Sequence, residues 1–154
     1  MRVGAAAAAA AAVAAITVLS VQTAHLNGRL NQAQSAAGSL SGAAQAALLD
    51  PHAQRVVLHG TGAQAQEVAE IVTQPSGNAF VFNRGLHPLA ADKTYQLWAI
   101  HGAQPVSLGL LGQDPATVAL HLGTAASGTT YAVTVERAGG AVAPTSAPIA
   151  SATA

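Results

Sequence analysis

Histidine is the residue type in this 154-residue sequence best suited to binding a metal ion, and the chain has six. They are His25, His52, His59, His87, His101 and His121. No two of them are separated by only one, two or three residues, and there is no cysteine, so the short ligand spacings of zinc sites are missing. A site could form only if neighbouring strands brought His59, His101 and His121 together. We therefore expect solvent-facing histidines and predict no metal ligand.

Nucleophilic and acid–base catalysis find little support in the sequence. The absence of cysteine excludes thiol catalysis and a disulfide framework, and no serine stands in a GxSxG motif. Ser107 is expected on the polar face of a strand, and the paired carboxylates would have to be Glu67 and Glu70, which have the pattern of exposed positions. HGTGAQ, residues 59–64, lacks the helix beginning with Lys or Ser of a phosphate loop. We predict a protein that is not an enzyme, with no catalytic or cofactor-binding residues and no cofactor.

Charge is scarce in this chain. Only 8% of the residues are charged and the formal net charge is zero. A basic surface for nucleic acid is therefore absent, and we predict no nucleic-acid partner. The high apolar content and the recurring strand-like segments argue against a disordered chain.

The aromatic residues Tyr95 and Trp98 invite the question of a stacking site for a ligand. Both fall in KTYQLWAI, residues 93–100, whose alternation is that of a strand. Residues three apart on a strand point to opposite faces, so the two rings cannot form one platform. We predict a structural role for both, with one ring facing the core.

The first 23 residues form a candidate membrane segment. An uncharged run extends from Val3 to Val21, and as a helix it would span roughly 28 Å, close to the thickness of a bilayer's hydrocarbon core. Three interpretations remain open: a transmembrane anchor, a signal peptide cleaved near Gln22-Thr23-Ala24, and a soluble alanine-rich helix. The two membrane-targeted interpretations place the residues after roughly 25 outside the cytoplasm. For an anchor, Arg2 favours an N-terminus that stays inside.

The remaining elements change from helical to strand-like along the chain. Residues 24–50 predict a polar, partly helical stalk, which Asp50-Pro51 ends because the residue before proline avoids the helical conformation. From residue 54 onward the apolar period becomes two, as in strands. Seven segments are interpreted as strands: 54–60, 66–74, 78–85, 93–100, 106–112, 117–123 and 129–140. In 66–74, Val68 and Ile71 are three apart, as in a helix, but the turn that follows favours a strand. Turn residues separate the seven segments, among them Pro75-Ser76-Gly77-Asn78 and Gly102 to Pro105.

These elements predict an all-β fold after an N-terminal transmembrane helix, or signal sequence, at 1–23. The stalk at 24–50 leads into an antiparallel β-sandwich of about seven strands, Ig-like, at 51–149. No helical segment alternates with the strands, so a parallel sheet is not expected. Residues 150–154 are predicted to be a frayed tail.

Three stretches carry a recognisable pattern. They are LLDPHAQRVVLHGTG, then NAFVFNRGLHPLAADKTYQLWAIHGAQPVSLGLL, then YAVTVERAGGAVAPTSAPI. They resemble the C-terminal extracytoplasmic domain of the anti-sigma-K factor family (RskA-like) over about residues 48–149, chiefly through YQLW and the VTVE-x-AGG-x-x-x-PT run. Arg137 stands where the family often has proline. The motif residues, to which we assign a structural role, are Tyr95, Gln96, Leu97, Trp98, Gly109, Val135, Glu136, Gly139 and Gly140.

The resemblance implies a regulator of transcription: a single-pass protein of the bacterial inner (plasma) membrane whose C-terminal domain is extracytoplasmic. In this family a cytoplasmic N-terminal domain sequesters a sigma factor, the outer domain receives or gates a signal, and regulated intramembrane proteolysis frees the sigma factor. The implied partners are therefore the lipid bilayer, a sigma factor and a protease of that pathway.

Only Met1 and Arg2 precede the apolar run, so we expect the sigma-binding domain to be absent from this chain. The sequence would then be a truncated gene product, one half of a split protein, or a stand-alone tethered sandwich. The alternative function is a secreted or tethered envelope module that binds a ligand or partner through loops 85–92 and 101–105, with no role in sigma regulation.

Overall fold

The computed structural model describes the backbone of residues 4–62, 65–123 and 128–154, and the side chains of that range from residue 25 onward. The chain divides into two compact units, Met1–Gly42 and Ala43–Ala154. Helix α1 (Gly4–Leu49) begins in the first unit and ends in the second, which also holds all the described strands. The strands are β1 (Gln54–Gly60), β2 (Glu67–Thr73), β3 (Asn78–Asn83), β4 (Lys93–His101), β5 (Gln104–Gly112), β6 (Thr117–His121), β7 (Thr130–Arg137) and β8 (Ala150–Thr153).

Residues 4–49 of the predicted membrane segment and stalk form one helix of 46 residues, so the stalk is helical up to Leu49 and not only in part. The side chains of the apolar run from Val3 to Val21 lie outside the described residues. Among the residues that are described, no helix is both long enough and apolar enough to cross a membrane. The predicted stop at Asp50-Pro51 is confirmed: α1 ends at Leu49, and the Asp50 carboxylate accepts a hydrogen bond of 2.9 Å from the His52 backbone N–H.

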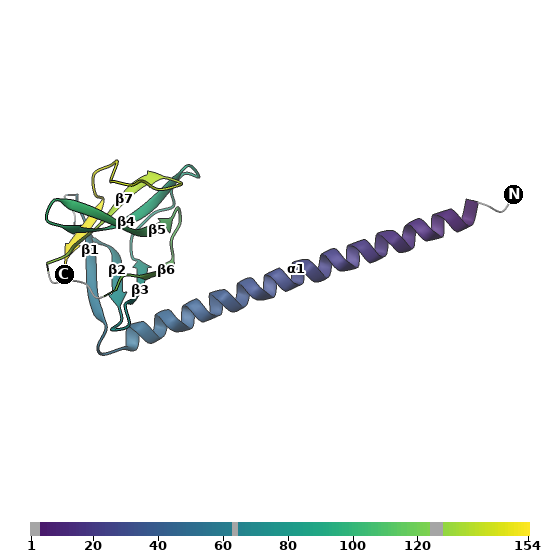
Figure 1. Cartoon of the computed structure of the whole chain (residues 1–154), viewed down its shortest axis with the longest axis horizontal. Helices are drawn as coiled ribbons and strands as arrows, with labels where there is room; N and C mark the ends of the chain where they lie inside the picture. The colour runs from purple at the N-terminus through teal and green to yellow at the C-terminus, as the bar shows by residue number, and fades with distance from the viewer. Residues whose placement is uncertain (1–3, 63–64, 124–127) are drawn as a thin grey trace. The chain divides into compact units, whose positions relative to one another are not determined.

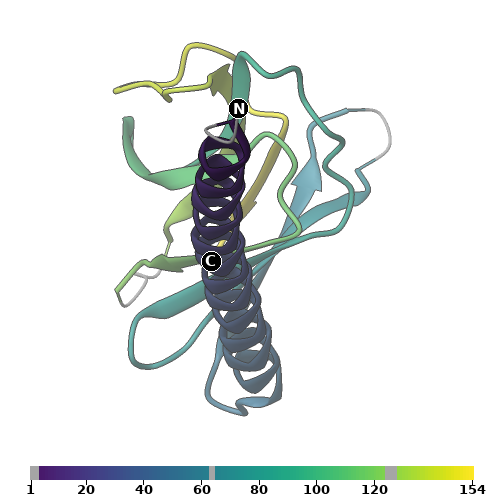
Figure 2. The same cartoon turned by 90° about the vertical axis from the view of Figure 1, so that its right-hand side faces the viewer.

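The strands of the second unit form a single antiparallel sheet with the order β5-β4-β7-β8-β1-β2-β3-β6 (Figure 1 and Figure 2). The sheet curls around one hydrophobic core, so it is nearly closed and resembles a barrel. The all-β, antiparallel prediction is confirmed. The arrangement differs from a sandwich of two separate sheets, because the ladder of strands is continuous from β5 to β6.

Strand β8 accounts for this difference. It pairs with β7 from Ala150 to Thr153 and with β1 at Ala150 and Ser151, so it joins two groups of strands that would otherwise be separate. Without it, β5-β4-β7 and β1-β2-β3-β6 would be the two sheets of the predicted seven-stranded sandwich. The residues at 150–153 therefore do not form the frayed tail that we predicted.

The two edges of the sheet, β5 and β6, meet side chain to side chain. A Cβ built on Gly109 of β5 would lie 2.8 Å from Cδ2 of Leu120 on β6, too close for any other residue without a shift. Because glycine has no Cβ, Leu120 can cover the seam between the edges and join the core. This packing gives the motif residue Gly109 a physical role.

The hairpins follow the sequence closely. The Pro75 to Asn78 turn joins β2 and β3, and the β4–β5 hairpin turns at Gly102-Ala103. That turn is shorter than predicted, since Gln104 and Pro105 already pair with β4. The core is built from inward-facing side chains of all eight described strands. Strand β5 does not contribute from its first half. The fully buried members of the core include Leu58, Ile71, Leu97, Val133 and Ala150.

Candidate functional site

The motif residues converge on β4, β5 and β7 and on the segment that follows β7. That segment, residues 138–149, is called the strap here, because it links β7 to β8 and is hydrogen-bonded to β7 and β4 along its length. The motif residues of β4 and β7 alternate between the two faces of the sheet. The site therefore has an inner half in the core and an outer half bound to the strap.

The inner half consists of Tyr95 and Leu97, which belong to the hydrophobic core, with Val135 packed against it. The Tyr95 hydroxyl donates a hydrogen bond of 2.7 Å to the backbone carbonyl of His87, so the ring also holds the loop that precedes β4. Burial raises the pKa of the Tyr95 phenol. The prediction that Tyr95 and Trp98 lie on opposite faces is confirmed, since Trp98 is fully buried but outside this core cluster.

Gln96 is the first outer contact to the strap. Its amide oxygen accepts a hydrogen bond of 2.8 Å from the backbone N–H of Ala141, and its amide nitrogen donates one of 2.9 Å to the carbonyl of the same residue. The amide nitrogen also donates to the Ser107 hydroxyl on β5, at 2.7 Å. Gln96 therefore binds the strap as a neighbouring strand would and joins it to β4 and β5.

Trp98, Thr134 and Glu136 make the second outer contact. The indole N–H of Trp98 donates to the Thr134 hydroxyl at 2.9 Å, and that hydroxyl donates to Oε1 of Glu136 at 2.7 Å. The strap completes the chain of bonds, because the backbone N–H of Thr145 donates to the same oxygen at 3.0 Å and its hydroxyl donates to Oε2. We call Gln96, Trp98, Thr134 and Glu136 the latch, since they fix the strap to the sheet.

Glu136 is the unusual member of the latch, because its side chain is a carboxylate that is only 1% exposed. No cation lies within ion-pair distance of it among the described residues. Burial raises the pKa of the Glu136 carboxyl, but the hydrogen bonds from Thr145, Thr134 and the strap backbone outweigh that effect, so its pKa lies below the ordinary value. The carboxylate is therefore ionised at neutral pH and stabilised by neutral donors.

Glycine is required at one position of the strap. Gly140 has φ +76°, and a Cβ there would lie 2.7 Å from Leu110 Cδ2 and 3.0 Å from the Gln96 amide oxygen. Gly139, its neighbour in the motif, would meet nothing within 4 Å. The motif's two glycines thus differ: Gly140 turns the strap against the sheet, whereas Gly139 is free of such contacts.

The arrangement contains no nucleophile beside a base, and its polar groups are committed to one another. The strap is bonded further along by the Ser146 hydroxyl to the backbone of Val135 and by the Ile149 N–H to the Val133 carbonyl at 2.8 Å. What the site can do is hold β7, the strap and β8 in place. Because β8 joins the two groups of strands, the latch stabilises the whole sheet.

The three histidines considered for a metal site lie in different places. His121 contacts Asn78 at 3.2 Å and His101 contacts Thr129 at 3.3 Å, whereas His59 pairs with β8 and β2. Among the side chains that the structure describes, no three histidine or acidic residues are grouped so that they could hold a metal ion.

A cluster of charged residues lies where the end of α1 meets the sheet. Glu70 on β2 forms ion pairs with Arg84 at 2.5 Å and with Arg55 at 3.5 Å, and Arg55 also donates to the backbone carbonyl of Leu48 at the end of α1. Ala47 of the last helical turn is completely buried, so this end of the helix packs within the second unit. The prediction that Glu70 occupies an ordinary exposed position is wrong, because the residue is only 8% exposed.

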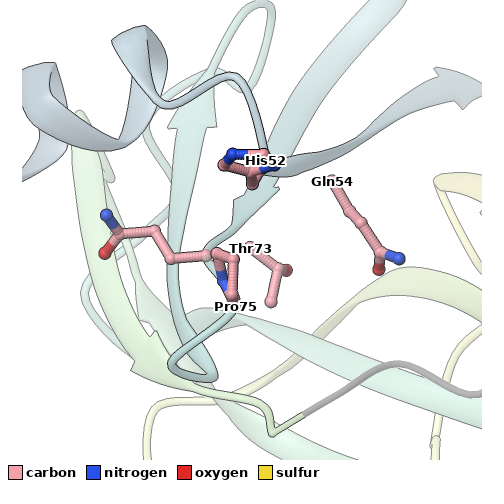
Figure 3. A pocket seen from close by; sticks show the side chains of 5 residues that line it. His52, Gln54, Thr73 and Pro75 are labelled. Carbon is pink, nitrogen blue, oxygen red and sulfur yellow. The ribbon is translucent and has the colours of Figure 1, made fainter.

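A pocket that the sequence does not predict lies between the α1–β1 loop and the β2–β3 turn (Figure 3). It has a volume of about 250 Å³ and is lined by His52, Gln54, Thr73, Gln74 and Pro75. It is distinct from loops 85–92 and 101–105, through which the alternative function would bind a ligand or partner. Uncharged polar residues beside a turn were the only sequence signal, and such residues are common in turns of every kind.

Comparison with known protein families gives a match that covers most of the chain. A family model described as "Anti-sigma-K factor rskA, C-terminal" matches residues 4–149, which span α1, strands β1 to β7 and the strap. No curated protein and no solved structure matches the chain.

Proposed function

Since the chain belongs to the family of C-terminal domains of anti-sigma-K factor RskA, we propose that it is the membrane-anchored, extracytoplasmic regulatory domain of an anti-sigma-K-type factor. The observation that carries this proposal is the extent of the family match, which includes both the N-terminal helix and the latch. The family has a regulatory role in transcription through a sigma factor. In keeping with that role, the latch builds structure and offers no reactive group.

The length of α1 supports an anchor followed by a stalk. Its 46 residues extend over about 69 Å at 1.5 Å per residue, more than twice the ~30 Å of a bilayer's hydrocarbon core. The uncharged run from Val3 to Val21 would lie in the bilayer, and the polar remainder of the helix would extend from it. The β unit would then receive or gate a signal outside the cytoplasm.

The partners in this proposal are the lipid bilayer, a sigma factor and a protease. The sigma factor would be held by a cytoplasmic domain that acts together with this one. Intramembrane proteolysis would release it. The proposal assigns no enzymatic activity to the chain itself.

Fractionation and cysteine labelling test the location. The natural chain has no cysteine, so a Val142→Cys variant carries one thiol at a fully exposed position of the strap. We expect this variant in the membrane fraction, where a membrane-impermeant maleimide labels it in intact cells. An Ala132→Cys variant, buried at 1% exposure, is the matched control and should react only after denaturation. Recovery in the cytosol, or labelling of Val142→Cys only after lysis, would contradict the location. An intact mass lacking the first two dozen residues would instead favour a secreted module.

A transcript measurement tests the regulatory part separately. We expect deletion or overexpression of the gene to change a set of sigma-dependent transcripts under envelope stress. An unchanged transcript set would refute the regulatory role and leave the location intact.

A further inference from the structure

We propose that the pocket of Figure 3 binds a small, neutral, hydroxyl-rich molecule, one sugar residue in size. This inference goes beyond the regulatory role, because it concerns a ligand that the protein would bind whether or not a sigma factor is its partner. Four observations carry it: fixed walls, free polar groups, the absence of charge, and the volume.

The walls of the pocket are held by the fold. Gln54 and Thr73 are directly opposite each other on β1 and β2, so their side chains lie on the same face of the sheet. On one side, the His52 backbone is bonded to the Asp50 carboxylate. On the other, the Gln74 N–H donates to the Asn78 carbonyl at 2.8 Å, which closes the β2–β3 turn. The pocket is therefore formed before any ligand arrives.

The polar side chains around the pocket have no protein partners. Within the described part of the chain, the side chains of His52, Gln54, Thr73 and Gln74 take part in no hydrogen bond. Figure 3 shows His52 on one side of the pocket and Thr73 and Pro75 across from it. The contrast with the latch is clear, because there the amide of Gln96 is used at both of its ends.

The chemistry of these groups favours hydroxyl ligands. Each glutamine amide both donates and accepts, the threonine hydroxyl does the same, and a neutral imidazole donates through one nitrogen and accepts through the other. A sugar presents hydroxyls with the same dual capacity, and the ring of Pro75 offers an apolar surface for its C–H face. Among the residues that the structure describes, no Asp, Glu, Lys or Arg side chain lines the pocket, so an anion or a cation would lose hydration without gaining an opposite charge.

The volume limits the ligand to one ring. Pockets for drug-sized ligands occupy about 300–1,000 Å³, and the 250 Å³ found here lies just below that range. A ligand so small and polar is expected to bind with a Kd on the order of 1 mM. It could come from a free monosaccharide or from the end of a longer glycan, since both present the same hydroxyls.

The test is an NMR titration of the ¹⁵N-labelled full chain in a zwitterionic detergent, because maltoside detergents would themselves supply sugar. Glucose and N-acetylglucosamine are the neutral probes, glucose 6-phosphate is the charged comparison, and a linear oligosaccharide of each sugar represents the glycan. We expect saturable shifts of the backbone amides at 52–54 and 73–78 with at least one neutral probe. A response to the oligosaccharide alone assigns the ligand to a glycan, and a response to the monosaccharide shows that a single ring suffices.

Two variants and two matched controls make the test specific. Gln54→Ala and Thr73→Val should each weaken binding about fivefold, the effect of one lost hydrogen bond to a neutral group. Gln104→Ala and Thr117→Val remove the same groups from β5 and β6, outside the pocket, and should leave the Kd unchanged. Gln54 is exposed, so its variant keeps the test valid even if Thr73→Val perturbs folding.

The proposal would be overturned if no sugar gave a saturable shift at about 100 mM, a hundred times the expected ~1 mM Kd. Equal binding of glucose 6-phosphate, or equal loss in the control variants, would overturn it as well.

Discussion

Two glutamates lie on the outward-facing side of the sheet, and the protein satisfies them by different means. Glu136 on β7 is 1% exposed and is bonded to hydroxyl and backbone N–H groups of β7 and the strap. Glu70 on β2 is 8% exposed and is paired with two arginines, Arg55 and Arg84, whose side chains are about half exposed, at 47% and 44%. One carboxylate is held by neutral donors under a covering segment, and the other by half-exposed cations at the surface.

The comparison indicates which cluster determines stability. Water can replace the arginines around Glu70, because solvent already reaches them, so little is lost when an ion pair opens. Water cannot replace the donors around Glu136 unless the strap leaves the sheet. A buried group that loses its partners incurs the full cost of desolvation. The latch should therefore be the more sensitive region, and four substitution experiments can test this ranking.

The largest effect is expected from Glu136→Ala. The change leaves the Thr134 hydroxyl and the Thr145 N–H without their acceptor, and should reduce the free energy of unfolding by about 3 kcal/mol. Urea unfolding of the full chain can be followed by the fluorescence of Trp98, the only tryptophan. The control is Glu67→Ala at an exposed position of β2, expected to change the stability by less than about 0.5 kcal/mol. Equal stabilities of the two variants would refute the role of the latch.

A smaller effect is expected where the strap turns. Gly140→Ala places a Cβ against Leu110 and Gln96 at a φ of +76°, and should cost about 2 kcal/mol. Gly139→Ala is the matched control, because it adds the same methyl group with nothing within 4 Å. Thermal unfolding of the two variants measures the difference. A cost at Gly139 as large as that at Gly140 would show that the motif glycines do not act through this contact.

Most strands of the fold could be predicted from the sequence, because alternation reports directly which side of a strand is buried. The predicted segment at 54–60 is identical to β1, and the turn at Pro75 to Asn78 was identified from its residues. Alternation does not report which strands share hydrogen bonds. β8 has the sequence Ala-Ser-Ala-Thr, without large apolar or β-branched residues except one threonine, so it looked like a tail. Because β8 was not predicted, the two groups of strands that it joins were predicted to be the separate sheets of a sandwich.

The motif residues were found by family resemblance, and the structure supplies their physical roles. Gln96 and Glu136 are polar residues on strands rich in apolar residues, and sequence alone does not tell whether such a side chain faces water or a covering segment. The partner atom of Gln96 lies on Ala141, 45 positions away, and that of Glu136 lies on Thr145, nine positions away. Distant pairings of this kind depend on the path of the strap, which no local pattern specifies. The pocket at His52 and Thr73 could not be predicted for the same reason, because its walls come together only in the folded chain.

The pH dependence of the free energy of unfolding tests the ionised Glu136 carboxylate while the natural side chain stays in place. Its folded-state pKa is lowered, so the stability contributed by the ionised carboxylate is fully present above the unfolded-state pKa of about 4.3 and is lost as the pH falls through the lower folded-state pKa. We expect the stability difference between the natural chain and Glu136→Gln to be constant from neutral pH to about 5 and to shrink below it. The stability lost on acidification should be smaller than the stability lost in Glu136→Ala, because protonation keeps both carboxyl oxygens in place. Urea unfolding at a series of pH values measures it, and a difference that grows on acidification would contradict the assignment.

The smallest effect is expected at the ion pairs beside α1. Glu70→Gln should cost about 0.5–1 kcal/mol at low salt, and the cost should fall as sodium chloride is added, because the half-exposed arginines are screened. Asp114→Asn, at an exposed position without an ion pair in the described chain, is the control and should show neither effect.

Arg55 keeps a second acceptor in the Leu48 carbonyl at the end of α1, where a cation is favourable in any case. The helix end should therefore stay packed when Glu70 is neutralised, with Ala47 still buried. A cost that is as large as that of Glu136→Ala and insensitive to salt would mean that both carboxylates are structural in the same sense, and would remove the distinction between the two regions.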